Sequence, residues 1–470
     1  MVQMNIMMNC LINTMGIGNS MKAIVLCGGE GSKFFPYQYK WQKGCIPIGN
    51  ESNIKRIIKQ LKKLQIKDIV VVLDYHSQQV RYELMDEDVQ YLQTDKHKIH
   101  MDLASLMDQS TLIYYGDTYA SDDDLYRLYK YYQQKGNAIL YRRSDQDTRV
   151  NDYIGAVVES EKIVNIYGHA RGHYVNSRLF GVMILDEKIK KYIQNSPFTF
   201  LNVPVGGMPK FEFYLEQSLL NAIEDSIDIY AVEAQNNVID IDFPWDILFA
   251  NEKFCLENVA TLQHDMIDES ASISKSACIR GKIVLGKNSV IGHNVMVYGN
   301  CIVGDNTVIE NNVILGKNCV IGNHCDIRDG CKISENTVIG HYNRIGFTAE
   351  VSGVTFDRVS IVHHSEVYGV VGSCTDIAAG CQMAILRFDD LENPNKVQQK
   401  KYTNKFTNAI FLGDNTRTGV GNIFMPGVKI GAHCALGPGL IIDRDIESHK
   451  IVMPKQEISI SEWSSQRYGW

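Results

Sequence analysis

A glycine-rich turn near the start of the chain carries residues that are suited to holding a phosphate. Residues 21–29 (MKAIVLCGG) have the pattern of a buried strand, and the turn places Gly28, Gly29 and Gly31 ahead of Lys33. Glycines after the first strand of an α/β sheet let backbone N–H groups approach phosphates at the crevice where such folds bind ligands. A tight turn without a ligand, and a solvated lysine, are the alternatives.

A second cation and an acid are expected at the same edge of the predicted sheet. Lys43 brings positive charge to the turn, and Asp117 follows the apolar run at the start of residues 111–119 (TLIYYGDTY). A carboxylate at the carboxyl end of a strand can hold Mg²⁺ against substrate phosphates. The alternative role for Asp117 is a helix N-cap, although Asp122 or Asp123 is better placed for it. The sequence therefore favours a metal site at Asp117.

Strands that alternate with helices are expected to position these groups. The strand pattern occurs in four apolar segments, at 21–29, 66–75, 111–119 and 137–143. Apolar and basic residues alternate at helical spacing from Asn53 to Leu64, and an acidic helix start follows Ser121. This order predicts a parallel sheet with both faces covered. The first domain is expected to end between Asn251 and Asn258.

The second half of the chain has an aliphatic residue at every sixth position from Ile267 to Val351. Neither a helix (about 3.6 residues per turn) nor a two-faced strand (about 2) has this period. A six-residue repeat predicts a parallel β-helix whose inward aliphatic residues stack into columns. The register breaks at 353–410 and resumes from Leu412 to Ile442, and the polar stretch 393–405 inside the break predicts a loop.

Several of the twelve cysteines follow the same register, four residues after an aliphatic position. They are Cys301, Cys319, Cys325, Cys331 and Cys434. Ser289 and Thr307 occupy the equivalent position, so it takes a small side chain. No CxxC pair occurs, and packing of a small residue is favoured over a metal site. This cysteine content without a disulfide-rich composition suits a reducing cytoplasm.

The composition excludes several classes of partner. The chain has 470 residues and a net charge of −7, with acids and bases interspersed. No basic run argues for nucleic acid, and no apolar run reaches the roughly 18 residues of a membrane span. Residues 1–20 lack Lys and Arg, so they are expected to be an extension and not a secretory signal.

Two segments resemble the signatures of sugar-1-phosphate nucleotidyltransferases. Residues 22–50 are similar to GGxGTRLxP followed by KPxxPxG, and residues 239–251 (IDIDFPWDILFAN) are similar to DIGxPWDLLxAN. The resemblance implies that Asp117 and Asp240 hold Mg²⁺ and that Lys43 contacts a substrate phosphate. It implies an NTP and a sugar 1-phosphate as substrates.

The chain departs from this family at several positions. The family arginine that grips the triphosphate is Lys33, which cannot form a planar bidentate contact. The GT pair that helps to seat the base is not evident in residues 97–106. The lysine that meets the sugar phosphate is not evident either, and Arg171 is a candidate to replace it. Asp242 stands where the closing segment has glycine.

A nucleotidyltransferase domain followed by a hexad coil is similar to the layout of GlmU-like bifunctional proteins. Residues 386–390 (LRFDD) and 412–431 resemble the acetyltransferase ends of the archaeal members, and the resemblance covers residues 22–450. It makes His363 the candidate general base, with a surface histidine as the alternative. The asparagine that binds the acceptor falls on Ile385. The resemblance also implies a homotrimer, with acetyl-CoA as a candidate second substrate.

The expected fold is an α/β Rossmann-like nucleotidyltransferase domain followed by a left-handed parallel β-helix. The expected division is an extension (1–20), the first domain (21–255), the coil (256–455) and a tail (456–470). The first hypothesis is nucleotidyl transfer from an NTP to a sugar 1-phosphate, with a β-helix of doubtful acyltransferase activity. The second is a non-catalytic regulator or assembly subunit that binds nucleotide sugars. The third is a fully bifunctional UDP-GlcNAc pyrophosphorylase and glucosamine-1-phosphate acetyltransferase.

Overall fold

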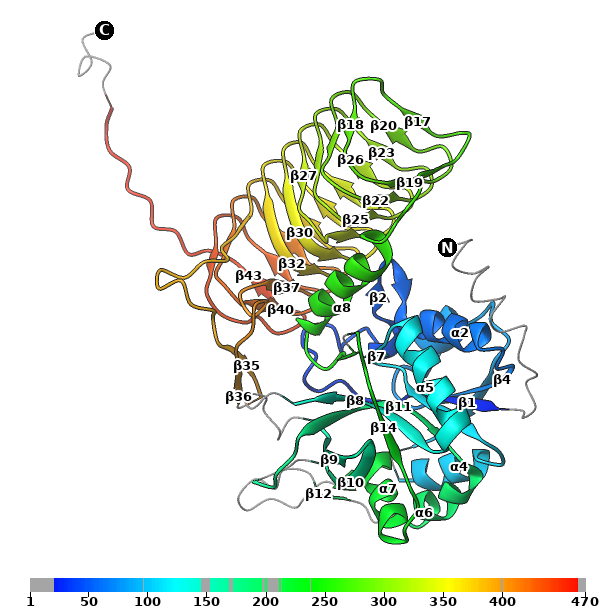
Figure 1. Cartoon of the computed structure of the whole chain (residues 1–470). Helices are drawn as coiled ribbons and strands as arrows, with labels where there is room; N and C mark the ends of the chain where they lie inside the picture. Colours follow the sequence, from blue (N-terminus) through cyan, green and yellow to red (C-terminus); the bar gives the residue numbers. More distant parts are fainter. Residues whose placement is uncertain are drawn as a thin grey trace. The chain divides into compact units, whose positions relative to one another are not determined.

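A computed structural model describes the chain in two compact units (Figure 1). The described residues are 21–95, 97–144, 153–168, 172–196, 199–200, 211–212, 214–236, 238–398 and 400–463. The first unit is Met1–Phe34 with Lys40–Lys253, and the second is Phe35–Tyr39 with Phe254–Trp470. The short segment Phe35–Tyr39 therefore packs with the coil, although it follows the glycine-rich turn in sequence.

A nine-stranded sheet forms the first unit, in the order β5-β4-β1-β6-β11-β8-β14-β10-β9. The strands are β1 (Lys22–Cys27), β4 (Asp68–Leu73), β5 (Gln90–Gln93), β6 (Thr111–Tyr115), β8 (Ala138–Arg143), β9 (Gly155–Glu159), β10 (Lys162–Tyr167), β11 (Ser177–Leu185) and β14 (Tyr230–Glu233). The predicted parallel pairing is confirmed from β5 through β6. β11 pairs antiparallel with β6 and with β8, so the sheet is mixed and the predicted parallel pairing holds for only part of it.

Helices cover both faces of this sheet, as the alternating pattern predicted. Alternate residues of β1 enter different cores: Val25 packs with α2 (Asn53–Lys63) and α5 (Asp122–Lys135), whereas Ile24 packs on the other face. That other core includes residues from α4 (Ile99–Leu106), α6 (Lys190–Gln194) and α7 (Leu215–Glu224). The N-cap of α5 is Ser121, and neither Asp122 nor Asp123 fills that position.

The second unit is a parallel β-helix of two- and three-residue strands. One flat side stacks β19 (Ile283–Leu285), β22 (Cys301–Val303), β25 (Cys319–Ile321) and β28 (Val338–Ile339) in parallel register. Cys301 pairs with Cys319, so one coil takes eighteen residues, or three hexads. Left-handed backbone conformations at corners such as Asn306 (φ 53°) let the chain turn between sides.

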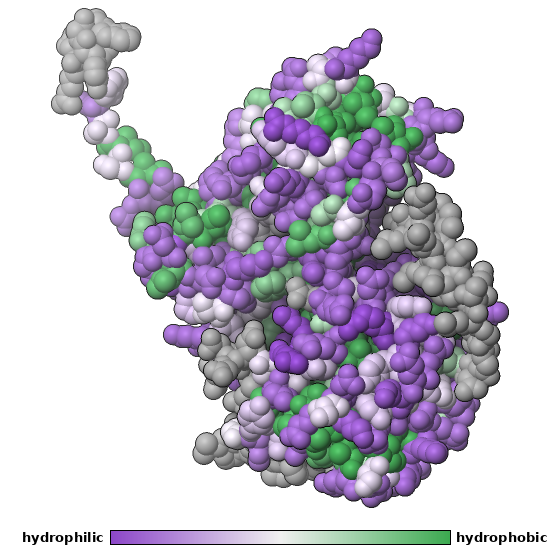
Figure 2. Space-filling view, in the orientation of Figure 1, coloured by the Kyte–Doolittle hydropathy of each residue, from purple (hydrophilic) through white to green (hydrophobic). Residues whose placement is uncertain are grey.

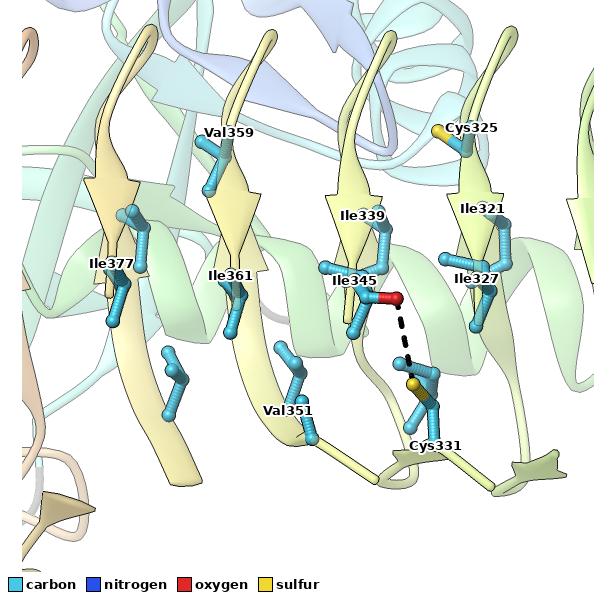
Figure 3. Packing of buried hydrophobic residues seen from close by; sticks show 14 of the residues in the cluster. Ile321, Cys325, Ile327, Cys331, Ile339, Ile345, Val351, Val359, Ile361 and Ile377 are labelled. Carbon is cyan, nitrogen blue, oxygen red and sulfur yellow. Dashed lines mark hydrogen bonds between the residues drawn. The ribbon is translucent and has the colours of Figure 1, made fainter. Parts of the chain in front are cut away.

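The interior of the coil is the predicted aliphatic column (Figure 3). The sixth-position residues from Leu285 to Val351 are buried, whereas Ile267 in the first coil is 48 % exposed. The cysteines of the small position also point inward. Cys331 Sγ, for example, donates to the carbonyl oxygen of Gly346 at 2.8 Å. The prediction that these cysteines fill a small interior position is confirmed.

The register break at 353–410 has two structural causes. First, the coil continues but shortens: Val351 pairs with Val367 and Ile361 with Ile377, sixteen residues apart. Gly353 (φ 113°) and Gly369 (φ 140°) make the tighter turns, in backbone conformations that other residues rarely adopt. Second, the chain leaves the coil after β34 (Gln382–Met383) and forms the hairpin β35 (Asn395–Val397) and β36 (Lys400–Tyr402) before β37 (Ile410–Leu412).

The segment Phe35–Tyr39 is anchored by its tyrosines within the second unit. Tyr37 is fully buried, its hydroxyl donates to the carbonyl oxygen of Val370 at 2.8 Å, and its ring lies 5.6 Å from that of Phe356. The ring of Tyr39 meets the stacked rings of His433 and His449 edge-on.

Among the helices of the described residues, none is long and apolar enough to cross a membrane.

Candidate active site

A short antiparallel pair brings the two predicted metal-binding acids together. β7 (Thr118–Tyr119) pairs with β15 (Ile239–Asp240), so that Asp240 lies opposite Thr118. The backbone N–H of Ile241 donates to the carbonyl oxygen of Asp117 at 2.9 Å. Asp117 and Asp240 are thus neighbours in space although 122 residues separate Asp240 from Thr118.

Lys43 lies between two carboxylates of this site. It begins the short 3₁₀ helix η1 (Lys43–Cys45) and is 8 % exposed. Its Nζ forms ion pairs with Asp117 and, at 2.9 Å, with Asp242. Burial alone would lower the pKa of Lys43, but the two carboxylates raise it well above its ordinary value. Lys43 is therefore a permanent cation at the predicted position.

Asp242 is a third acid of the site, and it stands where the resembling family has glycine. Burial acts to raise the pKa of Asp242, but Lys43 and Lys33 outweigh it and lower the pKa to about 2. Asp242 is consequently ionised over the whole physiological range. Sequence comparison showed this residue only as a departure from a motif, and the ion pair with Lys43 gives it a structural role.

Arg178 is a residue of the site that the sequence did not reveal. It lies near the start of β11, and its Nη2 donates to Asp240 Oδ2 at 2.6 Å. Thr118 Oγ1 donates to the other carboxylate oxygen of Asp240 at 3.0 Å. The only signal in the sequence was a cation at the head of an apolar strand, a feature that many strands share.

The glycine-rich turn lies beside Lys43. A Cβ atom on Gly29 would lie 3.7 Å from Lys43 Cε, and Gly31 has a positive φ of 66°. Lys33 is partly buried, with its Nζ 5.7 Å from the centroid of the Phe243 ring. A Cβ on Gly28 would approach Asp74 Cβ to 3.1 Å. Arg171, the proposed replacement for the sugar-phosphate lysine, lies outside the described residues.

Two further acids, the buried Glu216 and the half-buried Asp246, lie near the charged groups. Tyr115 Oη donates to Glu216 Oε2 at 3.0 Å, and burial raises the pKa of Glu216 to about 7 despite that hydrogen bond. Asp246 accepts hydrogen bonds from the backbone N–H groups of Asp242 (3.0 Å) and Phe243 (2.7 Å). Burial raises the pKa of Asp246 to about 7. Asp246 fixes the backbone that presents Asp242.

The two carboxylates of the site suit a metal ion whose coordination is completed by the substrate. Among the described residues, no group of three or more His, Cys, Asp or Glu side chains is arranged to hold a metal ion by itself. Mg²⁺ typically takes one or two carboxylates and fills its remaining positions with water and substrate phosphates. Asp117 and Asp240 provide two carboxylates, but Lys43 and Arg178 occupy them. A metal ion at this site would therefore compete with these cations for the carboxylates.

The predicted base of the coil lies on its surface. His363 and His364 are exposed, and their rings meet edge-on with centroids 5.1 Å apart. His364 Nδ1 hydrogen bonds with Thr348 Oγ1 at 2.5 Å. The carbonyl oxygen of Ile385 accepts from Asn408 Nδ2 at 2.8 Å, where the chain leaves the coil. His363 is thus accessible to solvent, as both a general base and an ordinary surface histidine would be.

Two family models match the chain. The MobA-like NTP transferase domain matches residues 23–236, and the GMPPB C-terminal domain matches residues 261–369. Together they cover parts of both structural units, with the boundary between them close to the end of α8 (Asp246–Phe254).

Curated relatives match the chain along most of its length. "Bifunctional protein GlmU" from Methanococcus maripaludis is 28 % identical in strain S2 and 29 % in strain C7, each over 94 % of this chain and 99 % of the relative. "Bifunctional sugar-1-phosphate nucleotidylyltransferase/acetyltransferase" from Sulfurisphaera tokodaii is 25 % identical over 91 % of this chain and 98 % of the relative.

Solved structures match about half of the chain. UDP-glucose pyrophosphorylase from Acinetobacter baumannii is 16 % identical with a TM-score of 0.42, over 51 % of this chain and 95 % of that one. The inositol-1-phosphate CTP transferase from T. maritima is 15 % identical with a TM-score of 0.40, over 48 % and 92 %.

Proposed function

We infer that this chain, a homologue of the archaeal bifunctional GlmU proteins, transfers a nucleotidyl group from an NTP to a sugar 1-phosphate. One observation supports the site above all others. Asp240, on β15, and Asp117, immediately before β7, come from distant parts of the sequence and lie close together, with Lys43 bound to Asp117. Two carboxylates and a buried cation after the strands of an α/β sheet suit the chemistry of phosphates.

The reaction needs positioning and charge neutralisation more than acid or base groups. A phosphate oxygen of the sugar 1-phosphate attacks the α-phosphorus of the NTP and forms a new O–P bond. The bond from the α-phosphorus to the bridging oxygen breaks, and pyrophosphate leaves with the electron pair. We assign Lys33 and the backbone N–H groups of residues 28–31 to the leaving group, and Lys43 to a substrate phosphate. Mg²⁺ held by Asp117 and Asp240 would supply charge neutralisation between the phosphates.

Substitution of the two acids tests this function. Asp117→Asn and Asp240→Asn should each abolish pyrophosphate release in Mg²⁺ with mixed NTPs and sugar 1-phosphates, because each removes a charge that the metal needs and keeps the shape. Asp86→Asn, at an exposed position, is the matched control and should behave as the wild type. Circular dichroism should show an unchanged fold. Wild-type turnover in either site variant would remove that residue from the metal site.

The second hypothesis, a non-catalytic regulator that binds nucleotide sugars, has an observation in its favour. Both proposed metal ligands are ion-paired with cations, and Lys33 stands where the resembling family has arginine. The same assay separates the two functions. A regulator would bind a nucleotide sugar without releasing pyrophosphate from any NTP.

We propose that any acetyltransferase activity of the coil is impaired or has changed its acceptor. Ile385 stands at the position of the acceptor-binding asparagine and offers only apolar side-chain atoms. An unpaired polar group on the acceptor costs about 1–3 kcal/mol, which corresponds to roughly tenfold to a hundredfold weaker use of glucosamine 1-phosphate. Consumption of acetyl-CoA with that substrate at the rate of an ordinary bifunctional enzyme would contradict the proposal and favour the fully bifunctional hypothesis.

We also propose that the coil assembles a homotrimer. Its flat sides expose apolar residues, among them Val290 (36 %), Val308 (38 %) and Ile314 (38 %). Figure 2 shows hydrophobic side chains gathered on the visible face near β18 (Cys278–Ile279) and β20 (Val290–Ile291). A groove on the side that stacks β17 (Ser272–Ile273), β20 and β23 (Val308–Ile309) is lined by residues 272–276, 290–293 and 308–311. Val290 and Val308 are neighbours on this side, and exposed apolar surface of this kind suits burial against another copy of the chain.

A further inference from the structure

Arg178 places a guanidinium inside the proposed site. Its Nη2 lies 2.6 Å from Asp240 Oδ2. The guanidinium carbon lies 5.0 Å from the centroid of the Tyr153 ring and 5.1 Å from that of Phe180. Two aromatic faces thus hold the group by contacts that do not fix its orientation strongly. The side chain keeps 32 % exposure, so part of it remains accessible from solvent.

The hydrogen-bonding capacity of Arg178 is incompletely used. A guanidinium carries five N–H donors in a planar fork. Nε is buried, and no described residue accepts a hydrogen bond from it. Asp240 meanwhile receives Arg178 on one oxygen and Thr118 on the other. An arginine with a buried, unpartnered donor beside a carboxylate expected to hold a metal is arranged to receive a further anion.

The charges of the site weaken the present pairing when a metal ion binds. A divalent cation on Asp240 would repel a guanidinium that held the same carboxylate. Arg178 would then need another anion nearby, and a substrate phosphate is one whose oxygens match the planar fork. No lysine of the kind that the resembling family uses for the sugar phosphate was evident in the sequence.

We propose that Arg178 is a substrate-binding residue that rests on Asp240 in the free protein and transfers to a substrate phosphate when a divalent cation occupies Asp240. The inference rests on the proposed function, because it takes Asp240 as a metal ligand. Arg178 thereby does two things: it balances the charge of Asp240 in the free protein, and it supplies a phosphate contact in the loaded one.

Binding measurements on Arg178→Gln test both parts. Titration of the nucleotide-free protein with Mn²⁺, followed by electron paramagnetic resonance, should show tighter binding in the variant, by about threefold or more, because Asp240 is released. Calorimetry in saturating Mg²⁺ with UTP alone, and with glucosamine 1-phosphate alone, should show about tenfold or greater weakening for at least one of them, as expected for a lost charge-assisted hydrogen bond. The ligand whose affinity falls, UTP or glucosamine 1-phosphate, is the one whose phosphate Arg178 contacts. Arg178→Lys keeps the charge, so its affinities should lie between those of the wild type and those of Arg178→Gln.

Arg143→Gln is the matched control. Arg143 lies on the same sheet, is exposed, and pairs with Glu233 at 3.5 Å. Its substitution should change neither affinity. If Arg178 only supported Asp240, Arg178→Gln would weaken Mn²⁺ binding, and that result would overturn the proposal. Unchanged affinity for both phosphate ligands, or unchanged affinity for Mn²⁺, would overturn it as well. These measurements need no turnover, so a wild type that releases no pyrophosphate would refute the proposed function and leave this test standing.

Discussion

At the scale of single residues, the site is a set of opposite charges that neutralise one another before any substrate arrives. Lys43 bridges Asp117 and Asp242, and Arg178 pairs with Asp240. Lys33 is placed differently: its ammonium group lies near an aromatic ring, and its charge acts on Asp242 from a distance. Lys33 is therefore the cation of the site best placed to serve a phosphate without breaking an ion pair that the structure shows.

Substitution of Lys33 should separate catalysis from regulation. Lys33→Ala should lower the rate of pyrophosphate release sharply, since one charged contact to a leaving group supplies about 3 kcal/mol, or roughly a hundredfold in rate. Lys33→Arg should be tolerated or should raise the rate, because arginine adds a bidentate contact. Lys67→Ala, at an exposed site, is the control. An alanine variant as fast as an active wild type would show that this turn does not grip the leaving group.

The buried carboxyl of Glu216 should make stability depend on pH. Its pKa in the folded protein is raised to about 7, from an ordinary value of 4.5, chiefly by burial. The folded state thus holds a proton that the unfolded state releases, and stability falls as pH rises between these values. Glu216→Gln removes the titrating group and can still accept from Tyr115. The variant should gain roughly 1–3 kcal/mol relative to the wild type between pH 5 and pH 8.

Chemical unfolding of both proteins at those two pH values checks this expectation. The difference between variant and wild type should grow with pH. A difference that stays constant from pH 5 to pH 8 would show that Glu216 is ionised in the folded protein.

The sequence pointed to the candidate site residues that stand in recognisable motifs and missed those that stand outside them. Lys43 and Asp117 were indicated by the strand and turn pattern, Asp240 was implied only by the family resemblance of residues 239–251, and the structure brings the three residues close together. Arg178 lies in a strand, and Glu216 lies in α7. Nothing in their local sequence separates them from ordinary charged residues, because their partners are 62 and 101 residues away. Only the folded arrangement assigns them a role.

At the scale of elements, a hydrogen bond accompanies the small position inside the coil. Several side chains at this position donate to a carbonyl oxygen fifteen residues later: Thr307 to Gly322 at 2.7 Å, Cys325 to Gly340 at 3.0 Å, and Cys319 to Ser334 at 3.1 Å. The sequence predicted a small side chain at this position from its spacing. It did not predict the donor, which Ser, Thr and Cys share and which alanine lacks.

Substitution of Cys319 should distinguish size from hydrogen bonding. Cys319→Ser keeps a donor, as at Ser289, and should stay close to the wild type in stability. Cys319→Ala leaves the carbonyl of Ser334 without this donor and should lose about 0.5–1.5 kcal/mol of unfolding free energy. Thermal unfolding measures the difference, with Cys374→Ala at an exposed position as control. Equal losses for serine and alanine would mean that the sulfur contributes through packing alone.

At the scale of the whole molecule, the assembly proposal makes a measurable prediction. Light scattering at micromolar concentration should give the mass of three chains. Val308→Lys places a charge on the apolar side of the coil and should shift the population towards the monomer, because burial of an unpaired ammonium is costly. Met85→Lys, which is also exposed but belongs to the first unit, should leave the mass unchanged. A stable wild-type monomer would contradict the trimer.

Local sequence patterns predicted the fold class of both units. They did not predict where the coil shortens or which strand of the sheet runs antiparallel. Six-residue spacing identified the coil because each hexad builds one side, and it lost the register where Gly353 and Gly369 shorten the turn. The antiparallel placement of β11 could not be predicted, because a run of nine mostly apolar residues fits either direction.

The anchoring of Phe35–Tyr39 has a consequence for how such a chain can be divided. A gene fragment that encoded residues 21–253 would carry these residues without the groups that bury them. Tyr37 would lose the ring of Phe356 and the carbonyl of Val370, and a side chain that is now fully covered would face water. That fragment would be prone to self-association, so a division of the gene at residue 253 would need compensating substitutions in the segment Phe35–Tyr39.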